Sequence, residues 1–319
     1  MTDSESVSEI PLRARYEAID ANNDRSWYMT RPRSFETFQS VGTVKPAAAR
    51  FGEHALRQTL AGNMSELYPK TEDMTENQKY TAALANMMRF YRSVDLTPRD
   101  MVNTVILYPQ REYGIPLKVV NVDEHSNQSS FIEPMIAYER GDFMYTRDPN
   151  RILAARPADC PIVLATADTP EGPTLMLTHF AWEGAASGFI DDMFAEYDKL
   201  GVNRDSLQLY VTPGGQAESF PYVNFTKYDP LKKFPGTESL FKDYTSNPDG
   251  SFDFNIDTPH FVYEQLVNHG MKPEQIYADT SDTSEKTSGY SSNGRALRSG
   301  GEETNIRDII LAKMNSVVT

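Results

Sequence analysis

The sequence has only one cysteine, Cys160, among 319 residues. A single cysteine excludes a disulfide within the chain, and this favours a reducing compartment. No apolar run approaches the roughly 20 residues that span a bilayer. The N-terminus also lacks the basic segment and following apolar stretch of a signal peptide. We therefore predict a cytoplasmic protein with no membrane partner.

Basic residues are also in the minority. The chain has 31 Lys and Arg against 45 Asp and Glu, for a formal net charge of −14. A surface of that sign repels polyanions, which argues against nucleic acid as a partner. Hydrophobic residues make up 39% of the chain, enough for a large core. The composition thus predicts a globular protein, and its charge says little about whether the substrate is a small molecule.

The patterns along the chain predict one main domain. Residues 1–45 are polar and irregular, and we expect an N-terminal extension there, whereas 46–319 show neither a repeat nor a linker. Strand patterns occur both in neighbouring pairs and between amphipathic helices. This favours a layered α+β sandwich with mixed sheets over a doubly wound parallel sheet. Residues 225–252 are predicted to be rich in loops, and a helix is predicted between an N-cap at Thr258 and Gly270.

Cys160 opens the apolar run "CPIVLA", which is followed by the loop "TADTPEGP" and a second apolar run, "TLMLTHF". The two runs predict an antiparallel hairpin. With the turn centred on Thr169–Pro170, Ile162 would face Leu177 and Cys160 would face His179. Directly opposed residues have Cβ atoms about 5 Å apart. A thiol and an imidazole at that distance can share a proton or bind one metal ion.

Three interpretations of Cys160 are open at this point. It could be a small buried hydrophobe, the nucleophile of a Cys–His dyad, or a metal ligand. A metal site needs a further ligand, and His125 is the best-placed candidate. It follows the apolar stretch "PLKVVNV" and precedes the polar "SNQSS", so it is predicted at a strand end that faces a loop. Functional residues commonly lie in such places.

Three ordered motifs give the sequence a family resemblance. They are "NVDEHS", "PADC" and "THFAWEGAASGFI", and they are followed by "VTPGGQAESFPY" and "FDFNIDTPHFVYEQLVNHGMKPEQIYADTSDT". The chain thereby resembles the laccase-domain family, whose members have been called multicopper polyphenol oxidases, peptidoglycan editing factors and purine nucleoside phosphorylases. That family has a His at a strand end, an Ala-Asp-Cys before an apolar strand, and a His-Ala-Gly-Trp-Arg-Gly that opens a helix.

The resemblance implies a metal site, usually zinc, held by the equivalents of His125, Cys160 and His179. Three protein ligands leave a fourth position open for water or substrate. Copper is the less favoured metal, because one three-ligand site does not supply the several copper ions that laccase oxidation needs. The implied fold is similar to that of cytotoxic-necrotizing-factor-like cysteine hydrolases. The implied activities are phosphorolysis of purine nucleosides and deamination of adenosine, with Cys160 and His179 as catalytic residues.

The resemblance also implies substrate contacts from Trp182, Glu183, Gly184 and Tyr290. A helix beginning near Gly184 would point its N-terminal N–H groups at the metal and attract phosphate. Glu183, however, stands where the family has an arginine, and a carboxylate beside a phosphate opposes phosphorolysis. Two further alternatives are therefore kept: a metal-free Cys–His hydrolase or amidase of the peptidoglycan-editing type, and a metal-binding protein without catalysis.

Overall fold

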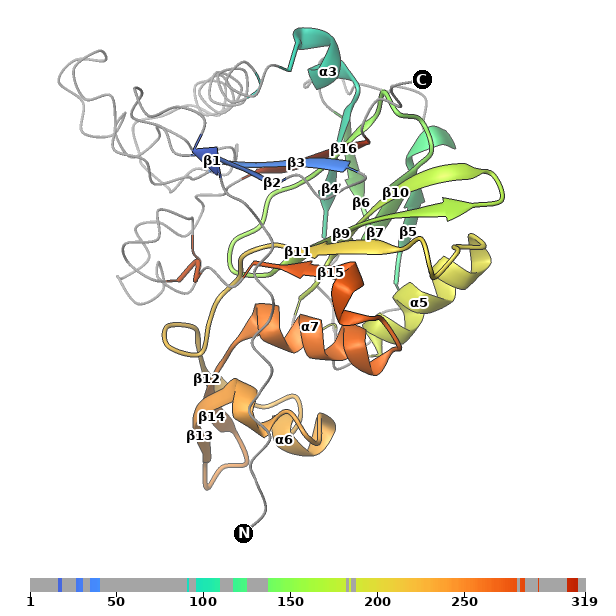
Figure 1. Ribbon diagram of the computed structural model, residues 1–319. Coiled ribbons are helices and arrows are strands. Elements are labelled where there is room, and N and C mark those ends of the chain that lie inside the picture. Colours follow the sequence, from blue (N-terminus) through green and yellow to red (C-terminus); the bar gives the residue numbers. More distant parts are fainter. Residues whose placement is uncertain are drawn as a thin grey trace, which may run out of the picture.

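The structure is a computed structural model of the chain, and two mixed β-sheets form its centre (Figure 1). A smaller antiparallel sheet and a few helices complete the described part. The described residues are 91, 96–109, 117–124, 137–181, 184, 188–279, 282–284, 292 and 309–314, with the backbone of three strands between residues 17 and 40.

The first sheet has seven strands. β4 runs parallel to its neighbours β6 and β8, whereas the other pairs are antiparallel. In order across the sheet, the strands are β1 (Glu17–Ala18), β2 (Trp27–Thr30), β3 (Phe35–Ser40), β16 (Ile310–Met314), β8 (Ile152–Ala155), β4 (Thr104–Tyr108) and β6 (Ala137–Arg140). The irregular character expected of residues 1–45 is therefore corrected, because β3 pairs with β16 through five residues, Phe35 to Gln39. The domain boundary after residue 45 stays a prediction.

The second sheet has six strands and carries the Cys160 region. Its edge pairs, β15 with β11 and β5 with β7, are parallel, and its central pairs are antiparallel. In order, the strands are β15 (Ile276–Ala278), β11 (Gln208–Val211), β9 (Ile162–Thr169), β10 (Gly172–His179), β7 (Phe143–Thr146) and β5 (Val119–Asn121). β9 and β10 alternate between two apolar faces, as expected of strands buried on both sides.

The two sheets pack face to face. Leu164 and Leu177 of the six-stranded sheet share one core cluster with Leu153 and Ile310 of the seven-stranded sheet. On the other face, the six-stranded sheet is covered by two helices, α5 (Phe189–Lys199) and α7 (Thr258–Asn268), as Figure 1 shows. The fully buried Met193 of α5 is part of this second core. The six-stranded sheet is thus the middle layer of a sandwich, which confirms the predicted layered α+β fold.

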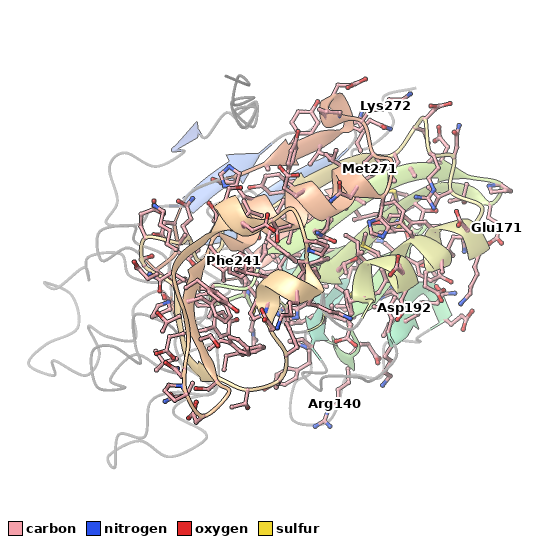
Figure 2. All side chains as sticks on the ribbon, turned by 90° about the horizontal axis from the view of Figure 1, so that it is seen from below. Arg140, Glu171, Asp192, Phe241, Met271 and Lys272 are labelled. Atoms are coloured by element: carbon pink, nitrogen blue, oxygen red, sulfur yellow. The ribbon has the colours of Figure 1, made fainter. Side chains whose placement is uncertain are left out.

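Residues 225–252, predicted to be rich in loops, contain one strand and one end residue of each of the other two strands of a small antiparallel sheet. Its strands, in order, are β12 (Pro221–Phe225), β14 (Phe252–Ile256) and β13 (Phe241–Ser246). Aromatic contacts explain why this polar stretch is ordered: Phe254 stacks on Tyr222 at 5.1 Å and contacts Phe241 at 5.5 Å between ring centroids. Figure 2 shows Phe241 and Glu171 on opposite sides of the molecule.

The remaining short elements join the sheets. They are α3 (Pro98–Val102), η1 (Val122–Glu124), α6 (Pro230–Lys233), η2 (Glu238–Leu240) and η3 (Pro273–Gln275). In the part of the chain that the structure describes, no helix has the length and apolar character needed to cross a membrane.

The predicted N-cap of α7 is corrected, and the helix predicted from near Gly184 is interrupted before α5. α7 is capped by Asp257, whose side chain accepts from the His260 N–H at 3.0 Å, and Thr258 is its first residue. The Thr258 hydroxyl instead donates to the Gly215 carbonyl at 2.9 Å. α5 begins at Phe189 after a left-handed Gly188, although Gly184 is itself helical. Asp is at least as good an N-cap as Thr, so the sequence allowed either Asp257 or Thr258 as the N-cap of α7.

Candidate functional site

The predicted hairpin forms, but its register differs by two residues. Thr169 pairs with Gly172, which leaves a two-residue turn and makes each strand eight residues long. His179 therefore pairs with Ile162 rather than with Cys160. The turn is tight because Gly172 adopts a φ of 120°, which favours glycine. A shift of two residues keeps every side chain on its predicted face.

Cys160 and His179 consequently lie diagonally across one ladder. The ladder continues beyond the strands through a bond from the Phe180 N–H to the Pro161 carbonyl, 3.0 Å. Diagonal neighbours on one face have Cα atoms roughly 7–8 Å apart. His179 is buried, and Cys160 is half-buried and forms no disulfide. The structure thus brings the two predicted catalytic residues to the same end of the sheet.

One end of the strands of the six-stranded sheet is called the Cys160 end, and it is defined by Asp142, Cys160, His179 and Thr212. β7 and β9 begin there, and β10 and β11 finish there. Backbone bonds hold the edge together: the His179 N–H donates to the Asp142 carbonyl at 2.9 Å, and the Thr212 N–H donates to the Ile162 carbonyl at 3.0 Å. The Thr212 hydroxyl accepts from the Ile162 N–H at 2.9 Å. Hydrogen bonds to neighbouring strands therefore fix the backbone around Cys160 and His179.

Four carboxylates gather at the Cys160 end. Asp142, Asp159 and Asp279 are buried, and Asp282 is half-buried. Asp279 follows β15, where its N–H donates to the Val211 carbonyl at 2.9 Å. Burial, with the charge of Asp159, raises the pKa of Asp282, against hydrogen bonds from Ser219 and from two backbone N–H groups that lower it. Each of these acids that is ionised adds a negative charge, which favours a cation or a neutral ligand over an anion.

Sequence reasoning assigned no role to these acids, although two of them carried a signal. Asp142 directly precedes the apolar strand β7, and Asp159 directly precedes Cys160 within the "PADC" motif. A polar residue at a strand boundary beside a candidate nucleophile is a reasonable search criterion. Asp279 and Asp282 had no comparable signal, because only the parallel pairing of β15 with β11 brings them to this edge.

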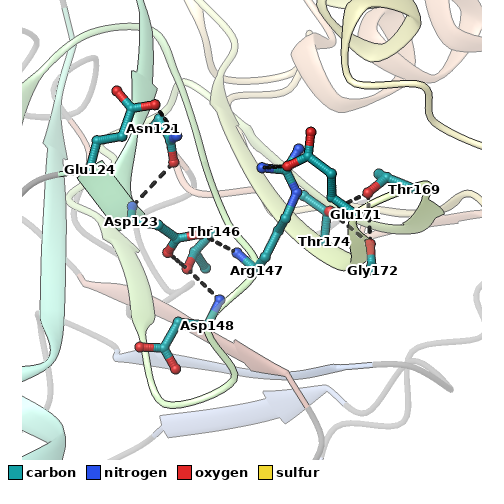
Figure 3. A network of polar contacts seen from close by, with 10 residues as sticks. All are labelled: Asn121, Asp123, Glu124, Thr146, Arg147, Asp148, Thr169, Glu171, Gly172 and Thr174. Carbon is teal, nitrogen blue, oxygen red and sulfur yellow. Dashed lines mark hydrogen bonds and ion pairs between the residues drawn. The ribbon is translucent and has the colours of Figure 1, made fainter.

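The opposite ends of the strands, near the turn between β9 and β10, are called the hairpin-tip end. Figure 3 shows the polar contacts there. Asp123 of η1 accepts from the Thr146 hydroxyl and from the Arg147 N–H at 2.8 Å. Arg147 pairs with Glu171 in the hairpin turn at 2.9 Å. β5 runs parallel to β7 and hence towards this end. Glu124, the last described residue before position 125, is therefore at the hairpin-tip end and far along the sheet from His179.

Several predicted site residues lie outside the described residues. These are His125, Trp182, Glu183 and Tyr290, so their predicted roles stay predictions. Gly184 is described, and a Cβ there would be 3.5 Å from the Phe189 ring, an ordinary contact. The first turn of α5 contains Asp191 and Asp192. Two carboxylates at this helix start already complement its dipole, so the start of α5 itself is unsuited to phosphate.

The described donors do not complete a metal site by themselves. Among the residues placed by the structure, no three His, Cys, Asp or Glu side chains are arranged to hold a metal ion. Cys160 and His179 supply one sulfur and one imidazole, both of which suit zinc. Zinc binding therefore requires a third ligand from outside the described residues.

The fold and the Cys160 end together define a layered α+β protein with a thiol and an imidazole at one end of its middle sheet. A family model described as multi-copper polyphenol oxidoreductase laccase matches residues 73–306. The chain belongs to this laccase family, as its motifs predicted. No curated protein matches the sequence.

Solved structures agree with the fold. The hypothetical protein YfiH of Bacillus licheniformis is 15% identical, with 91% of this chain and 93% of that chain covered and a TM-score of 0.59. YlmD of Geobacillus stearothermophilus is 14% identical, with 94% and 100% covered and a TM-score of 0.61. A Neisseria meningitidis protein is 16% identical, with 92% and 100% covered and a TM-score of 0.56. The predicted similarity to cysteine hydrolases of the cytotoxic-necrotizing-factor type stays a prediction.

Proposed function

We propose that the chain is a zinc-dependent cytoplasmic enzyme that acts on purine nucleosides, with Cys160 and His179 at its reaction centre. One observation carries this proposal: the single cysteine and a buried histidine lie at the same end of the six-stranded sheet, where His179 pairs with Ile162, two residues after Cys160. A thiolate and an imidazole can hold zinc, and an open zinc position makes water reactive near neutral pH. The third ligand is proposed to come from outside the described residues. His125 is the candidate that the family resemblance implies, and its side chain would have to return to the Cys160 end, because Glu124 lies at the opposite end of the sheet.

The charge around the pair favours deamination over phosphorolysis. Phosphate would meet the carboxylates of the Cys160 end, and Glu183 adds a further negative charge to the chain beside His179. A neutral nucleoside meets no such repulsion. At an effective dielectric constant of about 20, a charge pair about 4 Å apart is worth about 4 kcal/mol, and solvent reduces this value. Even a third of it is about tenfold in affinity.

The first experiment is elemental analysis of the purified protein, followed by an assay of adenosine, inosine, guanosine and methylthioadenosine with and without phosphate. We expect about one zinc per chain and ammonia release from adenosine that does not depend on phosphate. Strong phosphate dependence in the wild type, with no gain in Glu183→Arg, would contradict the charge argument.

Two variants test the ligands separately. Cys160→Ser should lose most of its zinc, because a neutral hydroxyl is a poor ligand beside a thiolate. His125→Ala should lose zinc to a similar degree. Full zinc in Cys160→Ser would refute the metal site, whereas full zinc in His125→Ala alone would assign the third ligand to another residue. The matched control is His269→Ala, since His269 pairs with Asp191 at 2.8 Å on the helix layer.

A second candidate is a metal-free Cys–His hydrolase or amidase of the peptidoglycan-editing type, in which Cys160 attacks and His179 acts as the base. The same two residues support it, because a thiol near an imidazole is the pairing of a nucleophile with its general base. Activity that survives chelation but not alkylation of Cys160 would support this candidate. Zinc without turnover of any nucleoside would instead indicate a metal-binding protein without catalysis.

A further inference from the structure

Asp159, the residue before Cys160, has an unusual backbone. Its φ is 75°, in the left-handed region, and its side chain is almost completely buried, with 1% exposed. Few residues other than glycine adopt this conformation, and Asp and Asn are the ones that tolerate it best. The backbone angles of Asp159 set the direction in which the chain enters Cys160. They therefore set the direction of the Cys160 side chain.

The side chain of Asp159 is held by a segment distant in sequence. Its Oδ1 accepts from the Thr283 hydroxyl at 2.8 Å and from the Ser284 hydroxyl at 3.0 Å. The Ser292 hydroxyl contacts that of Ser284 at 3.2 Å. Hydrogen bonds to an ionised acceptor are stronger than neutral ones. The loop after β15 thus fixes the rotamer of Asp159.

The main chain of Asp159 is held from another side. Its carbonyl accepts from the Gly215 N–H at 3.0 Å and lies 3.4 Å from the Thr258 hydroxyl. A Cβ at Gly214 would come within 2.9 Å of the same carbonyl, so only glycine permits this approach. Segments after β11, at the start of α7 and after β15 all meet at this one residue.

We infer that Asp159 is the positioning residue of Cys160: its buried hydrogen bonds hold the left-handed backbone that aims the thiol towards His179. The inference rests on the proposed function only in taking Cys160 as the reactive group. It assigns to Asp159 no contact with substrate or metal. Asp159 acts through two properties, the hydrogen-bond acceptor in its side chain and its positive φ. Different substitutions remove one or both of these properties.

Three variants make that separation. Asp159→Asn keeps an acceptor and tolerates a positive φ, Asp159→Gly keeps only the backbone freedom, and Asp159→Ala keeps neither. Thr283→Val removes one donor and leaves Asp159 unchanged. The matched control is Asp243→Gly, because Asp243 also has a positive φ, 53°, but is exposed in the three-stranded sheet.

The measurement is the rate of alkylation of Cys160 by iodoacetamide in the full chain under native conditions, first with chelator and then with zinc. Since Cys160 is the only cysteine, every adduct reports on it. With chelator, we expect Asp159→Asn and Asp243→Gly to stay within about twofold of the wild type. Asp159→Gly and Asp159→Ala should react at least about tenfold faster, and Thr283→Val should lie between, because local opening becomes more populated. Circular dichroism checks that each variant is folded; if Asp159→Ala is not, the other variants decide.

The zinc arm separates this inference from the proposed function. Zinc should slow alkylation in the wild type and in Asp159→Asn, and should slow it at least about tenfold less in Asp159→Gly. If zinc protects no variant, the metal site fails while the chelator arm still tests the positioning role. The inference is overturned if Asp159→Gly reacts like the wild type with chelator, or if Asp159→Asn reacts like Asp159→Gly.

Discussion

The two ends of the six-stranded sheet have polar groups of opposite character. At the hairpin-tip end, Arg147 and Glu171 form an ion pair whose Glu171 side chain is 71% exposed. At the Cys160 end, Asp159 is 1% exposed and hydrogen-bonded to a distant loop. Exposed pairs contribute little to folding, whereas buried polar groups are costly unless they are satisfied. Loss of the buried contacts at the Cys160 end is therefore expected to cost more than loss of the exposed ion pair at the hairpin tip.

The largest expected effect comes from His179→Asn. If His179 is a ligand or a base, this variant should lose at least about 100-fold of the nucleoside or hydrolase activity, with the fold retained. Arg147→Gln at the other end of the sheet should keep wild-type turnover. Equal activity of the two variants would remove the functional distinction between the ends.

The next effect is on stability. In Gly214→Ala, the new Cβ would be 2.6 Å from the Thr258 hydroxyl and 2.9 Å from the Asp159 carbonyl. Overpacking of this kind costs about 1–3 kcal/mol, measurable by urea unfolding. Gly184→Ala is the control, because its Cβ meets only ordinary contacts with the Phe189 ring. If the free energy of unfolding were unchanged in Gly214→Ala, the backbone around Asp159 and Thr258 would move at little cost to accommodate the methyl group.

A smaller effect depends on pH and concerns His260 at the start of α7. Burial alone would lower its pKa, but the hydrogen bond and charge of Asp257, with Glu264 and Glu218 nearby, raise it. A raised folded pKa adds stability that is complete below the unfolded pKa of about 6.5 and is lost as pH rises through the folded value. The difference in Tm between wild type and His260→Gln should therefore be largest in mild acid and shrink with rising pH. A difference that grows with pH would have the wrong sign.

The smallest effect is expected at the hairpin tip. Glu171→Gln removes the ion pair with Arg147, and exposed pairs are worth about 0–1 kcal/mol. Urea unfolding at low and high salt should show a loss below about 0.5 kcal/mol that salt abolishes. A loss as large as that of Gly214→Ala would contradict the contrast between the two ends.

The sequence by itself determined the elements whose patterns are local. The alternation of apolar residues predicted both strands of the hairpin, and the ordered motifs around Cys160 and His179 predicted the family. The alternation of buried side chains along both strands was also correct, because a strand alternates with a period of two whatever its partner, although the predicted pairing of Cys160 with His179 was wrong. Residues 225–252 are rich in loops, as predicted, but the pattern did not predict strand β13, whose sheet is held by aromatic contacts such as Phe241 with Phe254 that no local period reveals.

Only the tertiary structure decided the register and the surroundings of the site. The turn could close at Thr169–Pro170 or one residue later, and the left-handed region available to Gly172 selected the tighter, longer hairpin. The acids of the Cys160 end come from segments up to 140 positions apart, Asp142 to Asp282. Parallel pairing of β15 with β11 brings the last of them to Asp159. Such pairing depends on burial across the whole sheet, so it is decided only when the chain folds.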